Sequence, residues 1–100
     1  MKTHEEYMEL ALEEARKAEE IDEVPVGCVI VCDGEVISRG HNLKEQLNQA
    51  YAHAEMMAIQ KAAEIKGNWC LNDCDLYVTL EPCMMCTGAI NLSRIRTVYY

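Results

Sequence analysis

The sequence predicts an α/β domain in which a mixed β-sheet carries helices on its faces. Two observations support this fold class. Apolar stretches with the composition of strands alternate along the chain with stretches of helical periodicity. In addition, the connections between the second and third strands and between the third and fourth strands each contain a helix, which implies crossovers. No internal repeat or linker interrupts the 100 residues, so we expect residues 1–100 to form one domain.

Three stretches are expected to form helices, at residues 4–21, 54–66 and 83–93. Thr3 and Glu6 have the spacing of a capping box, which places the start of the first helix, and apolar residues then recur every three or four positions. Gly67 suits the end of the second helix, because glycine readily adopts the left-handed conformation found there. In the third helix, the small residues around Gly88 would allow a neighbouring backbone to approach closely.

Four stretches are expected to form strands, at residues 26–32, 35–41, 76–80 and 95–100. The Asp33-Gly34 pair between the first two predicts a tight hairpin turn, so these strands should be antiparallel. Residues 42–52 show no steady hydrophobic period and are expected to form a loop. The sequence stops inside the last strand, which is expected of a truncated or an unusually short chain.

The formal net charge of -8 at pH 7 argues against binding that is driven broadly by nucleic-acid phosphates, which requires a basic surface. The charge is unevenly distributed. Residues 1–23 contain nine acids and three bases, whereas residues 24–100 contain eight acids and six bases. The second part is therefore nearly neutral, and Arg94 and Arg96 could give a site there a cationic edge.

The 100 residues show neither a membrane-spanning stretch nor a signal peptide. No stretch approaches the ~20 consecutive apolar residues of a membrane span, and residues 1–6 are too polar for a signal peptide. We therefore expect a soluble cytoplasmic protein that does not associate with membranes. Its six cysteines should be reduced there, so the Cys83-x-x-Cys86 pair favours metal binding over a disulfide.

Two short motifs contain the residues of a metal site. Cys83 and Cys86 follow Pro82 on one turn, and His53 precedes Glu55 by two positions. His53, Cys83 and Cys86 are zinc-type ligands, and three protein ligands leave a fourth position for water, as in catalytic zinc sites. Both motifs fall at the start of an expected helix, where the helix dipole favours anionic ligands. Glu55 would act as general acid and base, so the set predicts a hydrolase.

The His-x-Glu motif followed by Pro-Cys-x-x-Cys is the signature of the zinc nucleobase deaminases. Beyond this signature, the sequence closely resembles the bacterial tRNA-specific adenosine deaminases from the first helix to the last residue. The segments that carry the resemblance are Val24-Pro25-Val26-Gly27, His41-Asn42, His53-Ala54-Glu55, Tyr77-Val78-Thr79-Leu80-Glu81-Pro82-Cys83-Met84-Met85-Cys86 and Gly88-Ala89.

This resemblance carries expectations about fold and function. It implies a three-layer α/β/α fold of the cytidine-deaminase type, with a mixed sheet in the strand order 2-1-3-4. The fold would be C-terminally truncated, because family members continue with a fifth strand and terminal helices. The resemblance also implies zinc-dependent conversion of the wobble adenosine of tRNA to inosine. The partners would be the tRNA anticodon loop and a second copy of the chain in a homodimer.

The resemblance further assigns roles to single residues within one zinc-dependent deaminase domain of residues 1–100. It implies one zinc ion per chain, held by His53, Cys83 and Cys86. Glu55 would shuttle protons between water, substrate and leaving group. Asn42 and Ala54 would contact the substrate nucleoside.

Two other functions are also considered. Deaminases of a free base or nucleoside, such as cytosine or guanine, share the ligand pattern, and an acidic surface would not penalise such substrates. Alternatively, the chain is a zinc-stabilised scaffold without turnover, in which the fourth strand forms an open sheet edge that invites pairing with another chain.

The remaining cysteine, methionine and histidine residues are expected to be structural. Four further cysteines could form a second metal site, although buried free thiols are favoured: Cys28, Cys32, Cys70 and Cys74. Four methionines are expected to fill the core: Met56, Met57, Met84 and Met85. Neither His4 nor His41 is expected to be a ligand, because the open three-ligand set is already complete.

Overall fold

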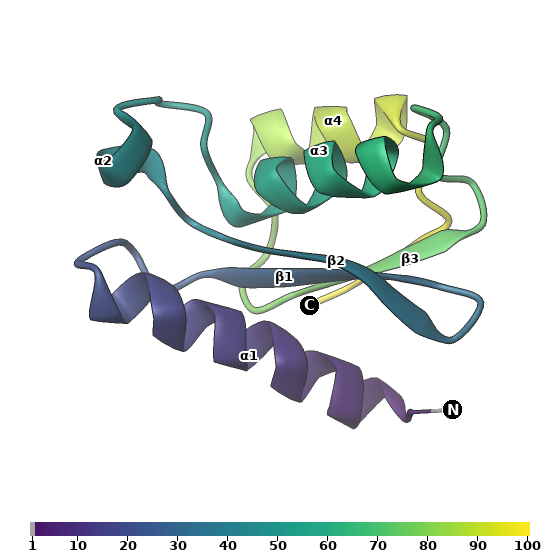
Figure 1. Ribbon diagram of the computed structural model, residues 1–100, viewed down its shortest axis with the longest axis horizontal. Helices are drawn as coiled ribbons and strands as arrows, with labels where there is room; N and C mark the ends of the chain where they lie inside the picture. The colour runs from purple at the N-terminus through teal and green to yellow at the C-terminus, as the bar shows by residue number, and fades with distance from the viewer. Residues whose placement is uncertain (1) are drawn as a thin grey trace.

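A computed structural model describes residues 2–100 of the chain (Figure 1). The elements occur in the order α1 His4–Glu20, β1 Gly27–Cys32, β2 Glu35–His41, α2 Lys44–Leu47, α3 Ala54–Lys66, β3 Cys74–Val78, α4 Met84–Leu92 and β4 Thr97–Tyr99. No helix in the described part of the chain is both long and apolar enough to cross a membrane.

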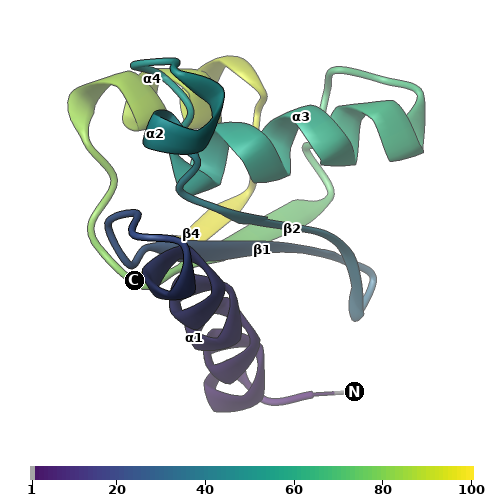
Figure 2. The same ribbon diagram turned by 60° about the vertical axis from the view of Figure 1, so that its left-hand side comes forward.

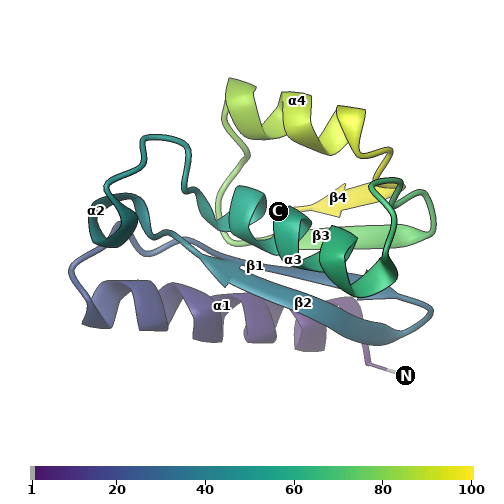
Figure 3. The same cartoon turned by 45° about the horizontal axis from the view of Figure 1, so that its top comes forward.

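The four strands form one mixed sheet in the order β2-β1-β3-β4 (Figures 2 and 3). Strand β1 is antiparallel to both β2 and β3, whereas β3 and β4 are parallel. The parallel pair is joined by α4, as expected for a crossover connection. The structure therefore confirms the mixed sheet and the predicted strand order.

Helices cover both faces of this sheet, with α1 on one face and α3 and α4 on the other (Figures 1 and 3). Side chains of β1 alternate between the two layers. Val29 and Val31 pack with Tyr7 of α1, whereas Cys28 and Ile30 belong to the core beneath α3 and α4. This alternation accounts for the continuous apolar run of β1, because a strand covered on both faces needs apolar side chains on each. The three-layer α/β/α prediction is confirmed.

Several local signals have the predicted structure. The Thr3 hydroxyl accepts the Glu6 N–H, and the Glu6 carboxylate accepts the Thr3 N–H, which completes the capping box. Asp33 and Gly34 both have positive φ, at 52° and 80°, as a tight hairpin turn requires. Gly67 ends α3 in the left-handed conformation, with φ of 64°.

Three element predictions are wrong in part, and one of them is the fourth strand, which spans Thr97–Tyr99 instead of residues 95–100. Residues 42–52 are not all loop, because they contain the short helix α2. The Glu23 carboxylate accepts the backbone N–H groups of Glu45 and Gln46, so this helix is capped by a residue distant in sequence and gives no local signal. In addition, β3 begins and ends two residues before the predicted 76–80, because its pairing is limited to the span of β1.

Glycine at position 40 allows α3 to lie directly on β2. A Cβ atom at Gly40 would lie 2.5 Å from the Ala54 carbonyl oxygen and 2.8 Å from the Ala58 nitrogen, both in the α3 backbone. Only glycine therefore lets the first turn of α3 reach this position. The expected close approach at Gly88 is not found within residues 2–100, where no atom outside its own helix would lie within 4 Å of an added Cβ.

These two glycines give a matched test. Gly40→Ala is expected to reduce the free energy of unfolding by about 1–3 kcal/mol, because the added methyl group pushes α3 away from the sheet. Gly88→Ala is the control and should stabilise the chain by ~0.5–1 kcal/mol, because alanine is favoured in an open helical position. Urea denaturation of both variants measures the difference. Equal stabilities would contradict the close packing of α3 on β2.

Candidate zinc and active site

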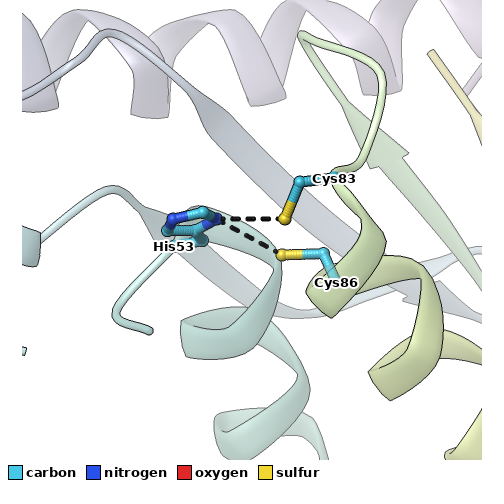
Figure 4. Close-up of side chains that lie close together, drawn as sticks. All are labelled: His53, Cys83 and Cys86. Atoms are coloured by element: carbon cyan, nitrogen blue, oxygen red, sulfur yellow. Dashed lines mark hydrogen bonds between the residues drawn. The ribbon is translucent and has the colours of Figure 1, made fainter. Parts of the chain in front are cut away.

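The predicted metal ligands lie at the N-termini of two neighbouring helices. His53 is the N-cap residue of α3, with φ -78° and ψ 159°, and Cys83 is the N-cap residue of α4, with φ -73° and ψ 175°. Cys86 lies in the first turn of α4. Neither cap side chain hydrogen-bonds to its own helix, and both point instead into the space between α3 and α4 (Figure 4).

The spacing of the three ligand atoms fits a tetrahedral zinc ion. The His53 Nδ1 atom lies 3.6 Å from the Cys83 Sγ atom and 3.6 Å from the Cys86 Sγ atom (Figure 4). A zinc ion with bonds of about 2.0 Å to nitrogen and about 2.3 Å to sulfur would place such atoms about 3.5 Å apart. The three side chains can therefore hold zinc and leave a fourth position open.

The surroundings of the ligands also suit a cation. Cys86 is fully buried, His53 is half-buried and Cys83 is exposed toward solvent. Burial raises the pKa of the Cys86 thiol, and the negative charge of Glu55 raises it further. A thiolate at Cys86 thus needs a positive charge nearby, which a zinc ion would supply.

Glu55 reaches the same place from the first turn of α3. Its side chain is 4% exposed and lines a cavity together with His53 and Cys83. Its charge contributes to the raised pKa of Cys86 and, after the effect of burial, to the raised pKa of Cys28 beneath the site. A carboxylate in this position can exchange protons with a molecule bound in the cavity.

The cavity has a volume of about 270 Å³, close to the lower end of small-molecule pockets. Its walls are mainly apolar, with polar groups at a few points, and its lining residues are Val24, Val26, Asn42, Lys44, His53, Ala54, Glu55, Leu80, Glu81 and Cys83. Asn42 and Ala54, which the resemblance assigns to substrate contact, are both among these lining residues. The Asn42 side-chain oxygen accepts the Lys44 N–H at 3.3 Å, so the amide NH₂ group is the part that can donate to a ligand.

One cavity residue that the sequence analysis missed is Lys44. It lies at the start of α2, is exposed and supplies a positive charge at the cavity mouth. The expectation that Arg94 and Arg96 form a cationic edge beside the site is wrong. Both precede β4 at the opposite end of the sheet, where the Arg96 guanidinium pairs with Asp75 through two contacts of 3.0 Å. Lys44 was missed because no local sequence pattern predicts the short helix α2 that carries it.

The other expected roles are only partly correct. Met84 and Met85 do not fill the core, because they are 92% and 38% exposed. Of the four further cysteines, Cys32 and Cys74 lie together, whereas Cys28 and Cys70 fall outside that group, so no four-cysteine site forms within the described residues. Cys32 and Cys70 are part-exposed rather than buried.

The two remaining histidines interact away from the ligand group. The His4 ring nitrogen hydrogen-bonds with the Tyr77 hydroxyl, and the His41 ring nitrogen lies 3.0 Å from the Glu14 carboxylate. Among residues 2–100, His53 is thus the histidine that lies with Cys83 and Cys86.

Comparison with known proteins agrees with this geometry. Residues 1–100 match the family model described as the cytidine and deoxycytidylate deaminase zinc-binding region. The chain is 57% identical over 94 residues to the tRNA-specific adenosine deaminase of Streptococcus pyogenes serotype M18. This match covers 94% of this chain and 59% of the relative. It is 52% identical to the protein of the same name from Bacillus subtilis strain 168, over 94% of this chain and 58% of the relative. The chain therefore spans about six-tenths of the length of these relatives.

Solved structures give the same result. A structure from a study of A-to-I editing by tRNA:A34 deaminases superimposes with a TM-score of 0.94 at 54% identity, covering 96% of this chain and 74% of that one. A guanine deaminase from Bacillus subtilis superimposes with a TM-score of 0.96 at 40% identity, covering 99% of this chain and 64% of that one. Because the family match extends over residues 1–100 and the fold and ligand geometry agree with it, the chain belongs to the cytidine and deoxycytidylate deaminase zinc-binding family.

Proposed function

We propose that residues 1–100 form a zinc-dependent deaminase domain that converts adenosine to inosine at the wobble position of tRNA. The observation that carries this proposal is the convergence of His53, Cys83 and Cys86 with the buried carboxylate of Glu55 at one cavity. The choice of substrate is supported by 57% identity to a protein named tRNA-specific adenosine deaminase.

In this proposal, His53, Cys83 and Cys86 would hold one zinc ion, which would act as a Lewis acid and supply a nucleophilic water near neutral pH. Glu55 moves the protons. Its carboxylate accepts a proton from the water that attacks C6 of adenine and donates it to a ring nitrogen. Glu55 then takes the proton of the new C6 hydroxyl and donates it to the amino group, which leaves as ammonia while C6 becomes the carbonyl of inosine. One water molecule is consumed and one ammonia molecule is released.

The cavity walls would hold the adenine base. The NH₂ group of Asn42 is available to donate a hydrogen bond, and Ala54 presents the first backbone N–H of α3. The apolar side chains of Val26 and Leu80 suit the faces of a planar base. The exposed ammonium of Lys44 at the mouth suits a phosphate group of the RNA, which compensates locally for the acidic net charge.

We also propose that the protein acts in the cytoplasm as a homodimer, as the family resemblance implies. The exposed apolar side chains of α4 support a further contact surface, since Met84 is 92% and Leu92 is 76% exposed.

A second candidate function is deamination of free guanine. The specific observation in its favour is the TM-score of 0.96 with a guanine deaminase at 40% identity. The net charge of -8 is also better suited to a small neutral substrate than to RNA.

The zinc proposal predicts a separation between metal binding and catalysis. His53→Ala and Cys86→Ala should lose both zinc and activity, because two ligands do not retain the ion at a solvent-accessible site. Glu55→Gln should keep zinc but lose activity by at least about 100-fold, because the amide cannot accept the proton. Zinc content by atomic absorption and ammonia release measure the two properties. Wild-type activity in Glu55→Gln would exclude the proposed proton transfer.

The substrate is tested with a panel of compounds. Ammonia release is measured with a tRNA anticodon stem-loop carrying adenosine at the wobble position, and with free adenosine, cytidine, cytosine and guanine. The proposal predicts turnover of the stem-loop and little turnover of the free compounds. Turnover of guanine alone would favour the second candidate, whereas zinc binding without any turnover would favour a scaffold.

A further inference from the structure

Two cysteines that the proposed reaction does not use face each other on the two inner strands of the sheet, β1 and β3. Cys32 ends β1 and Cys74 begins β3, and the two residues are direct partners in the antiparallel pairing. The same ladder ends at Cys28 and Val78, near the zinc ligands, so Cys32 and Cys74 lie at the opposite end of the sheet. They are therefore independent of the candidate zinc site.

The backbone pattern places Cys32 and Cys74 in a non-hydrogen-bonded pair. The Thr79 N–H donates to the Gly27 carbonyl at 3.1 Å, which identifies the Cys28–Val78 pair as non-hydrogen-bonded. Pair types alternate along an antiparallel ladder, so the Cys32 pair four residues away has the same type. In agreement, the Cys74 N–H donates to the Leu71 carbonyl and not to β1. Cα atoms in such pairs are about 4.5 Å apart, within the range of disulfides.

The side chains are also close, and both interact with Asp73. The sulfur atoms of Cys32 and Cys74 lie within 4.8 Å of one another, and each thiol donates to a different Asp73 oxygen, at 3.2 and 3.4 Å. The Lys66 ammonium lies 2.5 Å from both Asp73 oxygens and 3.6 Å from the Cys32 sulfur. Lysine thus occupies the place of a cation, which favours thiol chemistry over metal binding at this cluster.

The two thiols differ in access to solvent. Cys32 is part-exposed, whereas Cys74 is fully buried, and burial raises the pKa of Cys74 to about 12. A reagent from solvent therefore meets Cys32 first. Such a pair, with one accessible cysteine and a second beside it, suits two-step oxidation.

We propose that Cys32 and Cys74 are a thiol modification site that forms a cross-strand disulfide by exchange with a low-molecular-weight disulfide such as oxidised glutathione. The Cys32 thiolate attacks one sulfur of the small disulfide, whose S–S bond breaks and releases one small thiolate. The Cys74 sulfur, after loss of its proton, attacks Cys32 in the mixed disulfide and releases the second small thiolate. The protein loses two electrons and two protons, and two small thiols are formed.

The experiment equilibrates the zinc-loaded chain in glutathione buffers that range from reducing to oxidising. Proteolytic peptides are then mapped by mass spectrometry, with zinc content measured in parallel. The expected product is a linked pair of peptides containing Cys32 and Cys74, with zinc retained. The midpoint of thermal unfolding should rise by about 10 °C in the oxidised chain, because the bond closes a long loop across the sheet.

Serine variants separate this site from the other thiols. Cys32→Ser and Cys74→Ser should each abolish the linked peptide and the rise in Tm. Cys70→Ser is the matched control and should keep both, because Cys70 lies outside the cluster. Three results would overturn the proposal: glutathione that stays attached at Cys32, a disulfide formed only by Cys83 and Cys86 with loss of zinc, or a second zinc ion that Cys32→Ser fails to bind.

Discussion

Two helix N-termini must meet at one end of the sheet for the candidate site to exist. His53 caps α3 and Cys83 caps α4, and their ligand atoms lie 3.6 Å apart although thirty residues separate them in sequence. Each helix is held by a different part of the fold. Gly40 lets α3 lie against β2, whereas α4 is held in the crossover between the parallel strands β3 and β4. The distance between the ligand atoms thus depends on both the strand order of the sheet and the packing of the two helices on it.

The same place concentrates groups that resist deprotonation in a buried environment. The thiols of Cys28 and Cys86 both have raised pKa values, and Glu55 contributes to each. Bringing a carboxylate and thiols together away from water is unfavourable unless a positive charge accompanies them. A divalent cation between the two helices would satisfy this requirement, and it would also link the helices directly. If zinc is that cation, the chemistry proposed for the site and the stability of the fold would depend on the same ion.

Much of this arrangement could be predicted from the sequence, because its signals are local. The capping box at Thr3, the turn at Asp33 and Gly34, and the hydrophobic periods define most elements within two residues. The two short motifs contain five of the six proposed site residues, and the resemblance adds Asn42. Five of the six line one cavity, and the sixth, Cys86, lies with His53 and Cys83.

What the sequence did not reveal arises from contacts between distant segments. Helix α2 depends on hydrogen bonds to Glu23, more than twenty residues earlier, and this helix brings Lys44 to the cavity. Arg96 was expected beside the site, but it lies at the other end of the sheet because β4 runs parallel to β3. Met84 was expected in the core, yet it is 92% exposed. The direction of a strand and the exposure of a side chain are set by the assembled fold, and no local sequence pattern predicts them.

The central claim is that zinc joins α3 to α4 and so stabilises the whole domain. Thermal unfolding of the zinc-loaded chain, compared with the same chain after verified zinc removal by a strong chelator, tests it most directly. We expect removal to lower Tm by at least about 10 °C at neutral pH, because structural zinc is worth several kcal/mol. The difference should shrink at mildly acidic pH, since protons compete with zinc for the histidine nitrogen and for the two thiolates. An unchanged Tm after removal would show that the helices hold their positions without the ion and would contradict the account.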